Sequence, residues 1–332
     1  MKAAVYSRYG PPDVVQIQDV EKPVPKDNEI LIDVRAASVN PLDWHFMRGD
    51  VRLLTGVLAP KHKVLGAEIA GRVEAVGKHV KQFQPGDEVF GGLFGGKGMG
   101  GFAEYACSIE ERLALKPAAI SFEEAAGVTV AALTALQGLR DKGRIQPGQR
   151  VLVDGASGGV GTFAVQIAKS FGAEVTAVCS TRNVDTARSI GADQVIDYTR
   201  EDFTRSGQRY DLIFAANAYH SIFDYRRALN QDGICVVAGS GSLRIILQVM
   251  LLGPLLSLIG SKKVRFFVTK MIKKDLVLLS DLLAARKVVP VIDRRYSLGG
   301  VSEALRYLEE GHAQGKVVIT VSPATPLQRE ET

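Results

Sequence analysis

The sequence predicts an α/β protein in which a doubly wound parallel sheet forms one domain and a β-rich unit forms the other. At 332 residues the chain is longer than one hydrophobic core usually supports, so we expect two domains. The first third contains short apolar stretches separated by prolines and glycines, which is typical of strands. From residue 150 onward, apolar strand-like stretches alternate with helical ones. This alternation predicts parallel strands that are covered by helices on both faces.

The composition narrows the class of protein further. Hydrophobic residues make up 46% of the chain and charged residues 23%, which suits a folded soluble protein. The net charge of +5 is mild and the basic residues are scattered, which argues against a nucleic-acid partner. Cys107, Cys179 and Cys235 lie far apart, so we expect neither a disulfide framework nor a cysteine-based structural zinc site. The opening MKAAVYSRYG has no apolar signal core, and a cytoplasmic location is predicted.

The N-terminal third is expected to supply the β-rich unit. Its apolar stretches predict strands at 1–7, 29–39, 69–77 and 87–93. The glycine-rich segment 91–105 is either a surface loop or a mobile wall of a substrate cleft. The pattern changes at Ser121, where a serine and two acidic residues precede an apolar run. This is the signature of a capped helix, which we predict over 121–139.

Strands and helices alternate through the middle of the chain. The expected strands lie at 150–155, 174–180, 194–198, 210–217 and 234–241. Helices are expected from Gly159, around Thr186 and near Tyr225. The C-terminal part predicts a helix over 275–288, a strand over 288–298, a helix over 302–312 and a strand over 315–321. The polar tail from Ser322 is expected to be loose.

The stretch VLVDGASGGVG, residues 151–161, is similar to the glycine-rich turn that binds the pyrophosphate of a dinucleotide. A strand precedes it and a helix follows it, although alanine replaces the first glycine of the G-x-G-x-x-G pattern. Gly158 would let the backbone approach the phosphates, Gly161 would let the helix pack on the strand, and the helix N-terminus offers free N–H groups. The alternative is a tight turn without a ligand. The predicted cofactor contacts are Ala156, Ser157, Gly158, Gly159 and Val160.

The end of the second strand decides between the two nicotinamide cofactors. An enzyme that prefers NAD carries Asp or Glu there, and a carboxylate would repel the 2′-phosphate of NADP. This chain instead has Ser180, Thr181 and Arg182, whose hydroxyl and guanidinium groups can bind that phosphate. NADPH is therefore the predicted cofactor, unless Arg182 is only a solvated charge. Residues that follow the carboxyl ends of later strands are expected in the same crevice: Asn217, Gly239 and Ser240.

One long apolar stretch, LRIILQVMLLGPLLSLIG, occupies residues 243–260. Arg244, Gln248 and Pro254 interrupt it, and its uninterrupted part is shorter than the about 20 residues that a membrane-spanning helix needs. One interpretation is a helix that packs on the cleft or at a subunit contact. The other is a surface that binds an apolar substrate or a membrane. A peripheral membrane contact would be favoured by the basic residues that follow, Lys262, Lys263 and Arg265.

Four motifs are spread along the chain: NPLDW at 40–44, GASGGVG at 155–161, GADQVIDY at 191–198 and EEGHAQGKVVI at 309–319. Together they resemble the zinc-free quinone oxidoreductase branch of the medium-chain dehydrogenase/reductases, the zeta-crystallin-like branch, over nearly the whole chain. The resemblance implies a GroES-like catalytic domain, 1–122 and 268–332, that is interrupted by a Rossmann NADPH-binding domain, 123–267. It also implies hydride transfer from NADPH to quinones or α,β-unsaturated carbonyls, and a homodimer.

Zinc alcohol dehydrogenases share the implied fold, so their metal ligands can be compared with this chain. Asn40 stands where they carry a catalytic cysteine, and Gly-Ala-Glu at 66–68 replaces their Gly-His-Glu. Their third ligand region corresponds to 127–129, which has no ligand in the usual place. A catalytic zinc normally needs three protein ligands, so the resemblance implies zinc-independent chemistry and no metal site. An alternative metal site would have to be assembled from His45, His62 and Glu68.

The resemblance also assigns individual residues. Asn40 is placed near the nicotinamide, where it can donate a hydrogen bond to the substrate, although it also suits a turn cap before Pro41. His45 is placed to donate to the substrate oxygen or the ribose, with a structural or surface histidine as the alternative. These two are the predicted catalytic residues. The implied cofactor contacts are Thr134 at the nicotinamide end, Tyr198 at the 2′-phosphate, and Lys316.

Two other functions are compatible with the sequence. One is a broad NAD(P)-dependent alcohol or carbonyl dehydrogenase, and the other is a non-catalytic NADPH-binding or membrane-adaptor protein. The cofactor turn does not distinguish them, because a fold does not determine an activity. Asn40 and His45 favour an enzyme, whereas segment 243–260 favours the adaptor.

Overall fold

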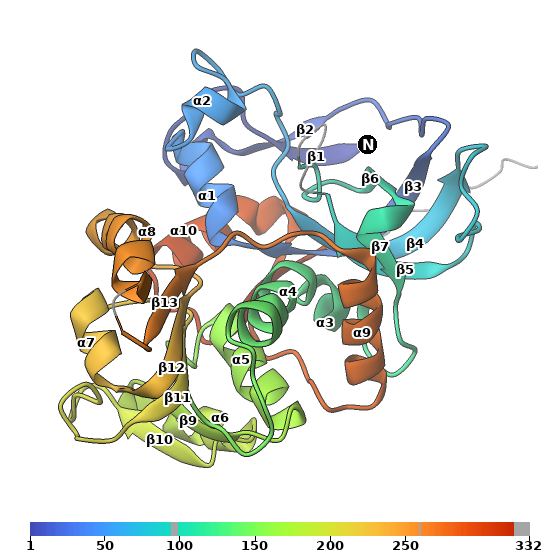
Figure 1. Cartoon of the computed structure of the whole chain (residues 1–332). Coiled ribbons are helices and arrows are strands. Elements are labelled where there is room, and N and C mark those ends of the chain that lie inside the picture. The colour runs from blue at the N-terminus through green and yellow to red at the C-terminus, as the bar shows by residue number, and fades with distance from the viewer. Residues whose placement is uncertain (94–98, 259, 322–332) are drawn as a thin grey trace, which may run out of the picture.

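Two large β-sheets organise the computed structural model, which describes residues 1–93, 99–258 and 260–321. One sheet has six strands and is built from the middle of the chain. The other has seven strands, six along its path and β6 off it, and combines both ends of the chain. Figure 1 shows the six-stranded sheet and its helices beside the seven-stranded sheet. The α/β fold class predicted from the sequence is therefore confirmed.

Every strand pair in the six-stranded sheet is parallel. The strands, in spatial order, are β10 (Gln194–Asp197), β9 (Glu174–Cys179), β8 (Arg150–Asp154), β11 (Tyr210–Ala215), β12 (Leu229–Val237) and β13 (Lys263–Phe266). The order changes direction between β8 and β11. Ligands of doubly wound sheets bind outside the carboxyl ends of the strands at such a switch point.

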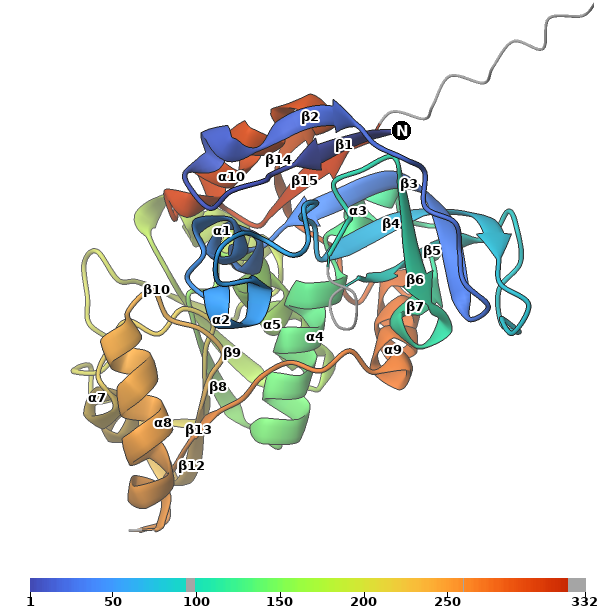
Figure 2. The ribbon, with the colours of Figure 1, turned by 90° about the horizontal axis from the view of Figure 1, so that it is seen from above.

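Helices cover both faces of this sheet because its strands direct apolar side chains to alternate sides. Val151 and Val153 of β8 belong to the core on one face, whereas Leu152 belongs to the core on the other. Figure 2 shows α4 and α5 on one side of the sheet and α7 and α8 on the opposite side. The helices around the sheet are α4 (Thr129–Gln137), α5 (Gly159–Ser170), α6 (Val184–Ser189), α7 (Ile222–Arg227) and α8 (Leu243–Leu258).

The seven-stranded sheet joins strands from the two ends of the sequence. Its order is β14 (Ile292–Ser297), β15 (Lys316–Thr320), β3 (Glu29–Val39), β4 (Glu68–Val76), β5 (Glu88–Gly92) and β7 (Leu113–Leu115), with β6 (Tyr105–Ile109) paired to β3. A short hairpin of β1 (Lys2–Val5) and β2 (Gln16–Asp19) lies beside it. β15 pairs antiparallel with β3, and Val317 lies opposite Val39. This register brings Lys316 next to Asn40, and the candidate site is built on that juxtaposition.

The single helix predicted over 121–139 is wrong, because the chain forms two helices there. Ser121 caps α3 (Phe122–Ala126) as predicted, since its Oγ accepts the Glu124 N–H at 3.1 Å and its own N–H donates to Glu124 Oε2 at 2.7 Å. The chain then turns at Gly127 before α4 begins. A Cβ at Gly127 would lie 3.3 Å from Cγ of Lys316, so the break accommodates a side chain from the far end of the sequence.

The remaining C-terminal predictions agree closely with the structure. The two predicted helices are α9 (Lys273–Ala284), which packs against β7 and α4, and α10 (Val301–Glu309). Strand β13 was not predicted. Among the residues that the structure describes, every helix falls short, in length or in apolar character, of what crossing a bilayer requires. The centre of the glycine-rich segment, 94–98, and the tail, 322–332, lie outside the described residues.

Candidate cofactor and substrate site

The predicted phosphate turn joins the end of β8 to the start of α5. Gly155 has φ +78°, a left-handed conformation that favours glycine. Gly158 is the N-cap of α5, and a Cβ there would meet only the Gly155 carbonyl oxygen, at 3.7 Å. A Cβ at Gly161 would lie 2.0 Å from the same oxygen, so glycine is required where α5 packs on the turn. Gly158 therefore borders open space at a helix N-terminus, which is a favourable place for a phosphate.

The loops after β11 and β12 meet beside this turn. The Ala218 N–H donates to the Gly239 carbonyl at 2.7 Å, and the Ser240 hydroxyl donates to the Ala218 carbonyl at 2.7 Å. A Cβ on Gly155 would lie 3.2 Å from Cβ of Asn217, so the β11 loop reaches the turn itself. The structure thus brings three of the predicted cofactor residues together at the carboxyl edge of the sheet: Asn217, Gly239 and Ser240.

The residues predicted at the 2′-phosphate gather at the ends of β9 and β10. Ser180 follows β9 directly and Tyr198 follows β10, with its side chain 61% exposed. Arg182 is exposed, and its Nη2 donates to the His312 carbonyl at 3.1 Å. The Thr181 hydroxyl is engaged with a neighbouring carboxylate, described next. These side chains form a polar rim at the surface, where a charged ligand group remains accessible.

Asp197 adds a negative charge to this rim that the sequence argument missed. Its Oδ2 accepts the Thr181 hydroxyl at 2.6 Å, and this hydrogen bond is the main reason why the pKa of Asp197 is lowered. The argument from β9 alone found no acid, because Asp197 belongs to the neighbouring strand, where it pairs with Cys179. Arg200 Nε lies 3.4 Å from Asp197 Oδ2 and partly balances the charge. The register of β9 and β10, which places Asp197 beside Cys179, is seen only in the structure.

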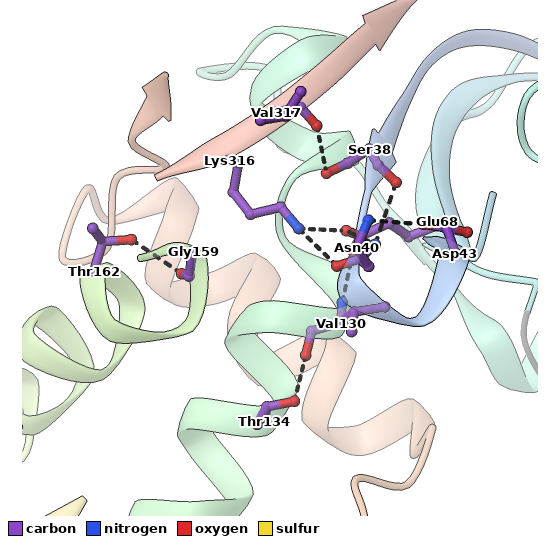
Figure 3. Close-up of polar contacts among 10 residues, drawn as sticks. All are labelled: Ser38, Asn40, Asp43, Glu68, Val130, Thr134, Gly159, Thr162, Lys316 and Val317. Atoms are coloured by element: carbon purple, nitrogen blue, oxygen red, sulfur yellow. Dashed lines mark hydrogen bonds and ion pairs between the residues drawn. The ribbon is translucent and has the colours of Figure 1, made fainter. Parts of the chain in front are cut away.

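A buried cluster of polar side chains lies where β3, β4 and β15 meet (Figure 3). The Lys316 ammonium donates to Asn40 Oδ1 and to Glu68 Oε1, each at 2.9 Å. The Asn40 amide donates to Glu68 Oε1 at 2.9 Å and to the Ser38 carbonyl at 3.2 Å. The Val130 N–H at the start of α4 donates to Glu68 Oε2 at 2.6 Å. Both carboxylate oxygens of Glu68 thus have partners, as a buried charge requires.

Lys316 connects this cluster to the phosphate turn. A Cβ on Gly159, the first residue of α5, would lie 2.9 Å from Cδ of Lys316. Figure 3 shows the lysine extending between the start of α5 and Asn40. Two of its three ammonium hydrogens are bonded within the cluster, to Asn40 and Glu68. The predicted role of Lys316 as a residue near the cofactor is consistent with this position, whereas the partner role of Glu68 was not predicted.

Asn40 is more tightly held than the sequence suggested. It is 3% exposed, and both hydrogens of its amide are already donated, to Ser38 and Glu68, while its oxygen accepts from Lys316. An Asn side chain has two N–H donors, so a hydrogen bond to a substrate would have to replace one of these. Asn40 is also the N-cap residue of α1 (Pro41–Arg48), as the alternative interpretation expected.

Asp43, in the first turn of α1, holds the loop that carries Asn40. Its two carboxylate oxygens accept the Asn40 N–H at 2.7 Å and the Gly66 N–H at 3.0 Å. Burial raises the pKa of Asp43 to about 7, and the charge of Glu68 contributes to the rise, although the two backbone hydrogen bonds oppose it. This carboxyl group therefore titrates close to neutral pH inside the protein.

Thr134 lies one helical turn beyond Val130 on α4. Its hydroxyl donates to the Val130 carbonyl at 2.7 Å and lies 2.8 Å from the hydroxyl oxygen of Thr269. Because Val130 also donates its N–H to Glu68, Thr134 is placed below the buried cluster (Figure 3). The structure thus brings Thr134 toward Asn40 and Lys316, as its predicted position at the nicotinamide end requires.

His45 is held in a different way from the other predicted catalytic residue. Its Nδ1 lies 2.7 Å from Asp50 Oδ2, its side chain is 43% exposed, and its ring stacks on Trp44 with 3.6 Å between the ring centroids. Its partner is therefore Asp50 rather than the cluster around Asn40. Within residues 1–93, 99–258 and 260–321, no group of three His, Cys, Asp or Glu side chains is placed to hold a metal ion.

Comparisons with known protein families agree with this architecture. The chain matches the zinc-binding dehydrogenase family over residues 190–319 and the alcohol dehydrogenase GroES-like domain over residues 26–118. It is 37% identical to 2-methylene-furan-3-one reductase of Solanum lycopersicum, over 97% of this chain and 80% of that protein. It is 34% identical to the chloroplastic quinone-oxidoreductase QR1 of Triphysaria versicolor, with coverage of 96% and 98%. It is 35% identical to the chloroplastic NADPH-dependent alkenal/one oxidoreductase of Arabidopsis thaliana, with coverage of 97% and 80%.

Solved structures show the same similarity. The quinone oxidoreductase from Coxiella burnetii superimposes with a TM-score of 0.85 at 28% identity and covers 97% of this chain and 99% of its own. The Escherichia coli quinone oxidoreductase complexed with NADPH superimposes with a TM-score of 0.82 at 25% identity, with coverage of 96% and 100%. The similarity therefore extends over both sheets.

Removing one partner of the buried ion pair should destabilise the protein more than removing both. Glu68→Gln leaves the Lys316 ammonium buried without a counter-charge, and about 3–5 kcal/mol of unfolding free energy is typically lost in this way. The double variant Glu68→Gln/Lys316→Met removes both charges and should recover much of that loss. Chemical denaturation of Glu68→Gln, Lys316→Met and the double variant measures the change in the free energy of unfolding. Strictly additive losses would contradict the assigned pairing.

The protein should lose stability as the pH rises toward 7, in part because of Asp43. Its pKa is about 7 in the folded chain and about 4 in an unfolded one, so the folded state binds the extra proton between these values. This stabilisation is complete below the unfolded pKa, declines by about 1.4 kcal/mol per pH unit, and is lost above pH 7. The stability difference between the wild type and Asp43→Asn should therefore change between pH 5 and pH 7. A difference that does not depend on pH would refute the assignment.

Proposed function

Because the chain belongs to the quinone oxidoreductase branch of the medium-chain dehydrogenase/reductase superfamily, we propose that it reduces quinones or α,β-unsaturated carbonyl compounds with NADPH. One observation carries the proposal: the buried cluster of Asn40, Glu68 and Lys316 borders the first residue of α5, where a dinucleotide phosphate is expected. The names of the relatives support the same reaction class, and NADPH is the cofactor named for two of them.

The protein contributes binding, orientation and charge to the proposed reaction, and bound NADPH supplies the hydride. The N–H groups of Ser157, Gly159 and Val160 suit the pyrophosphate, because they lie at the N-terminus of α5. Those of Ala156 and Gly158 already donate to backbone carbonyls. Lys316 adds a positive charge beside Gly159, and its ammonium is held by hydrogen bonds to Glu68 and Asn40. At the other end of the cofactor, the 2′-phosphate is assigned to Ser180, Thr181, Arg182 and Tyr198.

We propose that the reaction is independent of zinc, on the basis of the side chains available. Ala67 offers no ligand atom, and the Glu68 carboxylate already accepts hydrogen bonds from Asn40, Lys316 and Val130. Without a metal to polarise a carbonyl, the acceptor must be electrophilic by itself. Quinones and enones meet this requirement, because conjugation spreads the charge that develops on their oxygen. The donor of the final proton is not assigned to a residue.

The other features expected from the sequence stay predictions. These are the homodimer, the cytoplasmic location, the domain boundaries at 122 and 268, and the catalytic roles of Asn40 and His45. For Asn40 the proposal favours a positioning role. Both hydrogens of its amide are already donated and its oxygen accepts from Lys316, so it has no free donor for a substrate.

The purified chain should oxidise NADPH when quinones or enones are present, and more slowly with saturated aldehydes or simple ketones, because only the conjugated acceptors are activated. The decrease of NADPH absorbance measures the rate, and a chelator should leave it unchanged. Turnover of plain alcohols that the chelator abolishes would sink the zinc-independent mechanism. If no acceptor in the panel oxidises NADPH, the alternative of a non-catalytic NADPH-binding protein is favoured.

Neutralising Asp197 should raise the affinity for NADPH while leaving that for NADH nearly unchanged. The carboxylate lies beside Thr181, where it repels a 2′-phosphate, so Asp197→Asn should tighten NADPH binding roughly fivefold. Asp185→Asn is the matched control, because it removes the same charge from a fully exposed position on α6. Fluorescence titration with both cofactors provides the dissociation constants. An equal change for NADPH and NADH would rule out this role for Asp197.

A further inference from the structure

Helix α8 exposes a continuous apolar stripe along its outer side. Leu247, Leu251, Leu255 and Leu258 follow the three- and four-residue spacing of one helix face, and their side chains are 48% to 83% exposed. Met250, next to them on the helix, is 52% exposed. Single exposed apolar residues are common, but a contiguous stripe indicates a surface that contacts something.

The fold does not need this stripe, because α8 packs through its opposite side. Val249 and Gly253 are buried, and Ile245, Leu252 and Leu256 pack against the core that β12 and β13 share with α7. In both views α8 lies at the edge of the molecule, away from the seven-stranded sheet (Figures 1 and 2). The outer leucines are therefore available to a partner.

The charges within residues 233–274, which include α8 and its flanks, all have one sign. No Asp or Glu occurs between Asp232 and Asp275, a stretch that contains seven Lys and Arg residues. Arg244 is exposed at the start of α8, and Lys262 and Lys263 follow its end. The ammonium groups of these lysines donate to the carbonyls of Arg226 and Ser257, respectively, so they stay beside the last turn of the helix. Burial, and to a smaller extent the nearby Arg209 and Arg226, lower the pKa of Lys262.

This pattern selects one class of partner. A second copy of the chain would pair its stripe through a two-fold axis, which brings the basic ends of both helices together, and residues 233–274 contain no Asp or Glu to balance them. A small apolar ligand requires a concave pocket, whereas the stripe is the convex side of a helix. A bilayer with anionic headgroups satisfies both features, because its interior accepts leucine side chains and its surface attracts lysine and arginine.

We propose that α8 is a peripheral membrane-binding helix that lies on anionic bilayers with its leucine stripe inserted below the headgroups. With 16 residues the helix is about 24 Å long, which is shorter than the about 30 Å of a hydrocarbon core, so it lies on the membrane and does not cross it. This inference does not depend on the proposed enzymatic reaction.

Flotation of the full-length chain with lipid vesicles tests the proposal. The protein should float with vesicles that mix phosphatidylcholine and phosphatidylglycerol, should bind vesicles of phosphatidylcholine alone much more weakly, and should be released from the mixed vesicles by high salt. Leu251→Ser/Leu255→Ser should lower the binding about tenfold or more, because each leucine contributes apolar area that the bilayer would bury. Lys262→Gln/Lys263→Gln should abolish the preference for anionic vesicles.

A matched control separates this effect from general loss of surface hydrophobicity. Val24→Ser/Leu115→Ser removes two exposed apolar side chains from other regions of the chain, and binding should not change. Unchanged thermal melting shows that a variant is folded, and Leu251→Ser alone replaces the double variant if the latter melts early. The proposal is overturned if the wild type does not bind the mixed vesicles, or if Val24→Ser/Leu115→Ser lowers vesicle binding as much as Leu251→Ser/Leu255→Ser does. Sedimentation of the wild type and of Leu251→Ser/Leu255→Ser completes the test. If the wild type is a dimer and the double variant is a monomer, the stripe is a subunit contact and the membrane proposal is wrong.

Discussion

The buried ion pair between Lys316 and Glu68 is the interaction on which the rest of the site depends. Two charges withdrawn from water are tolerated only when hydrogen bonds satisfy their remaining polar atoms. Asn40 at the end of β3 donates to Glu68 and accepts from Lys316, and Val130 at the start of α4 donates to Glu68. Lys316 itself lies at the start of β15, so three segments meet at the pair. The pair therefore fixes where β15 joins the sheet, where α4 begins, and how the Asn40 amide is oriented.

The same lysine also lies against two glycines. Its aliphatic stem passes Gly127 at the break between α3 and α4 and Gly159 at the first turn of α5, and a side chain at either position would press on it. Lys316, a residue of the seven-stranded sheet, thus lies directly against the first residue after the phosphate turn.

Much of the fold was predictable, because parallel strands and a glycine-rich turn leave local signals in the sequence. The strand over 29–39 and the switch-point sheet with its turn at 155–161 follow from apolar periodicity and punctuation. The site was less predictable. Glu68 and Lys316 meet across 248 residues, and Asp197 reaches the cofactor rim only through pairing with a neighbouring strand. Such contacts depend on register, which composition and spacing do not specify. For His45 the sequence predicted a catalytic role from its place beside the NPLDW motif. In the structure its ring instead pairs with Asp50, which is only five residues away.

The sequence separation between Glu68 and Lys316 has a consequence for how the protein is made. A ribosome that adds about 5–20 residues per second needs roughly 12–50 s to travel from the first partner to the second. Throughout that interval the nascent chain carries Glu68 without its counter-ion and α4 without a settled N-terminus. The N-terminal sheet therefore cannot close as an independent early unit, and its last step awaits β15. Synthesis order makes the six-stranded sheet the first part that can be completed and the buried cluster around Lys316 the last.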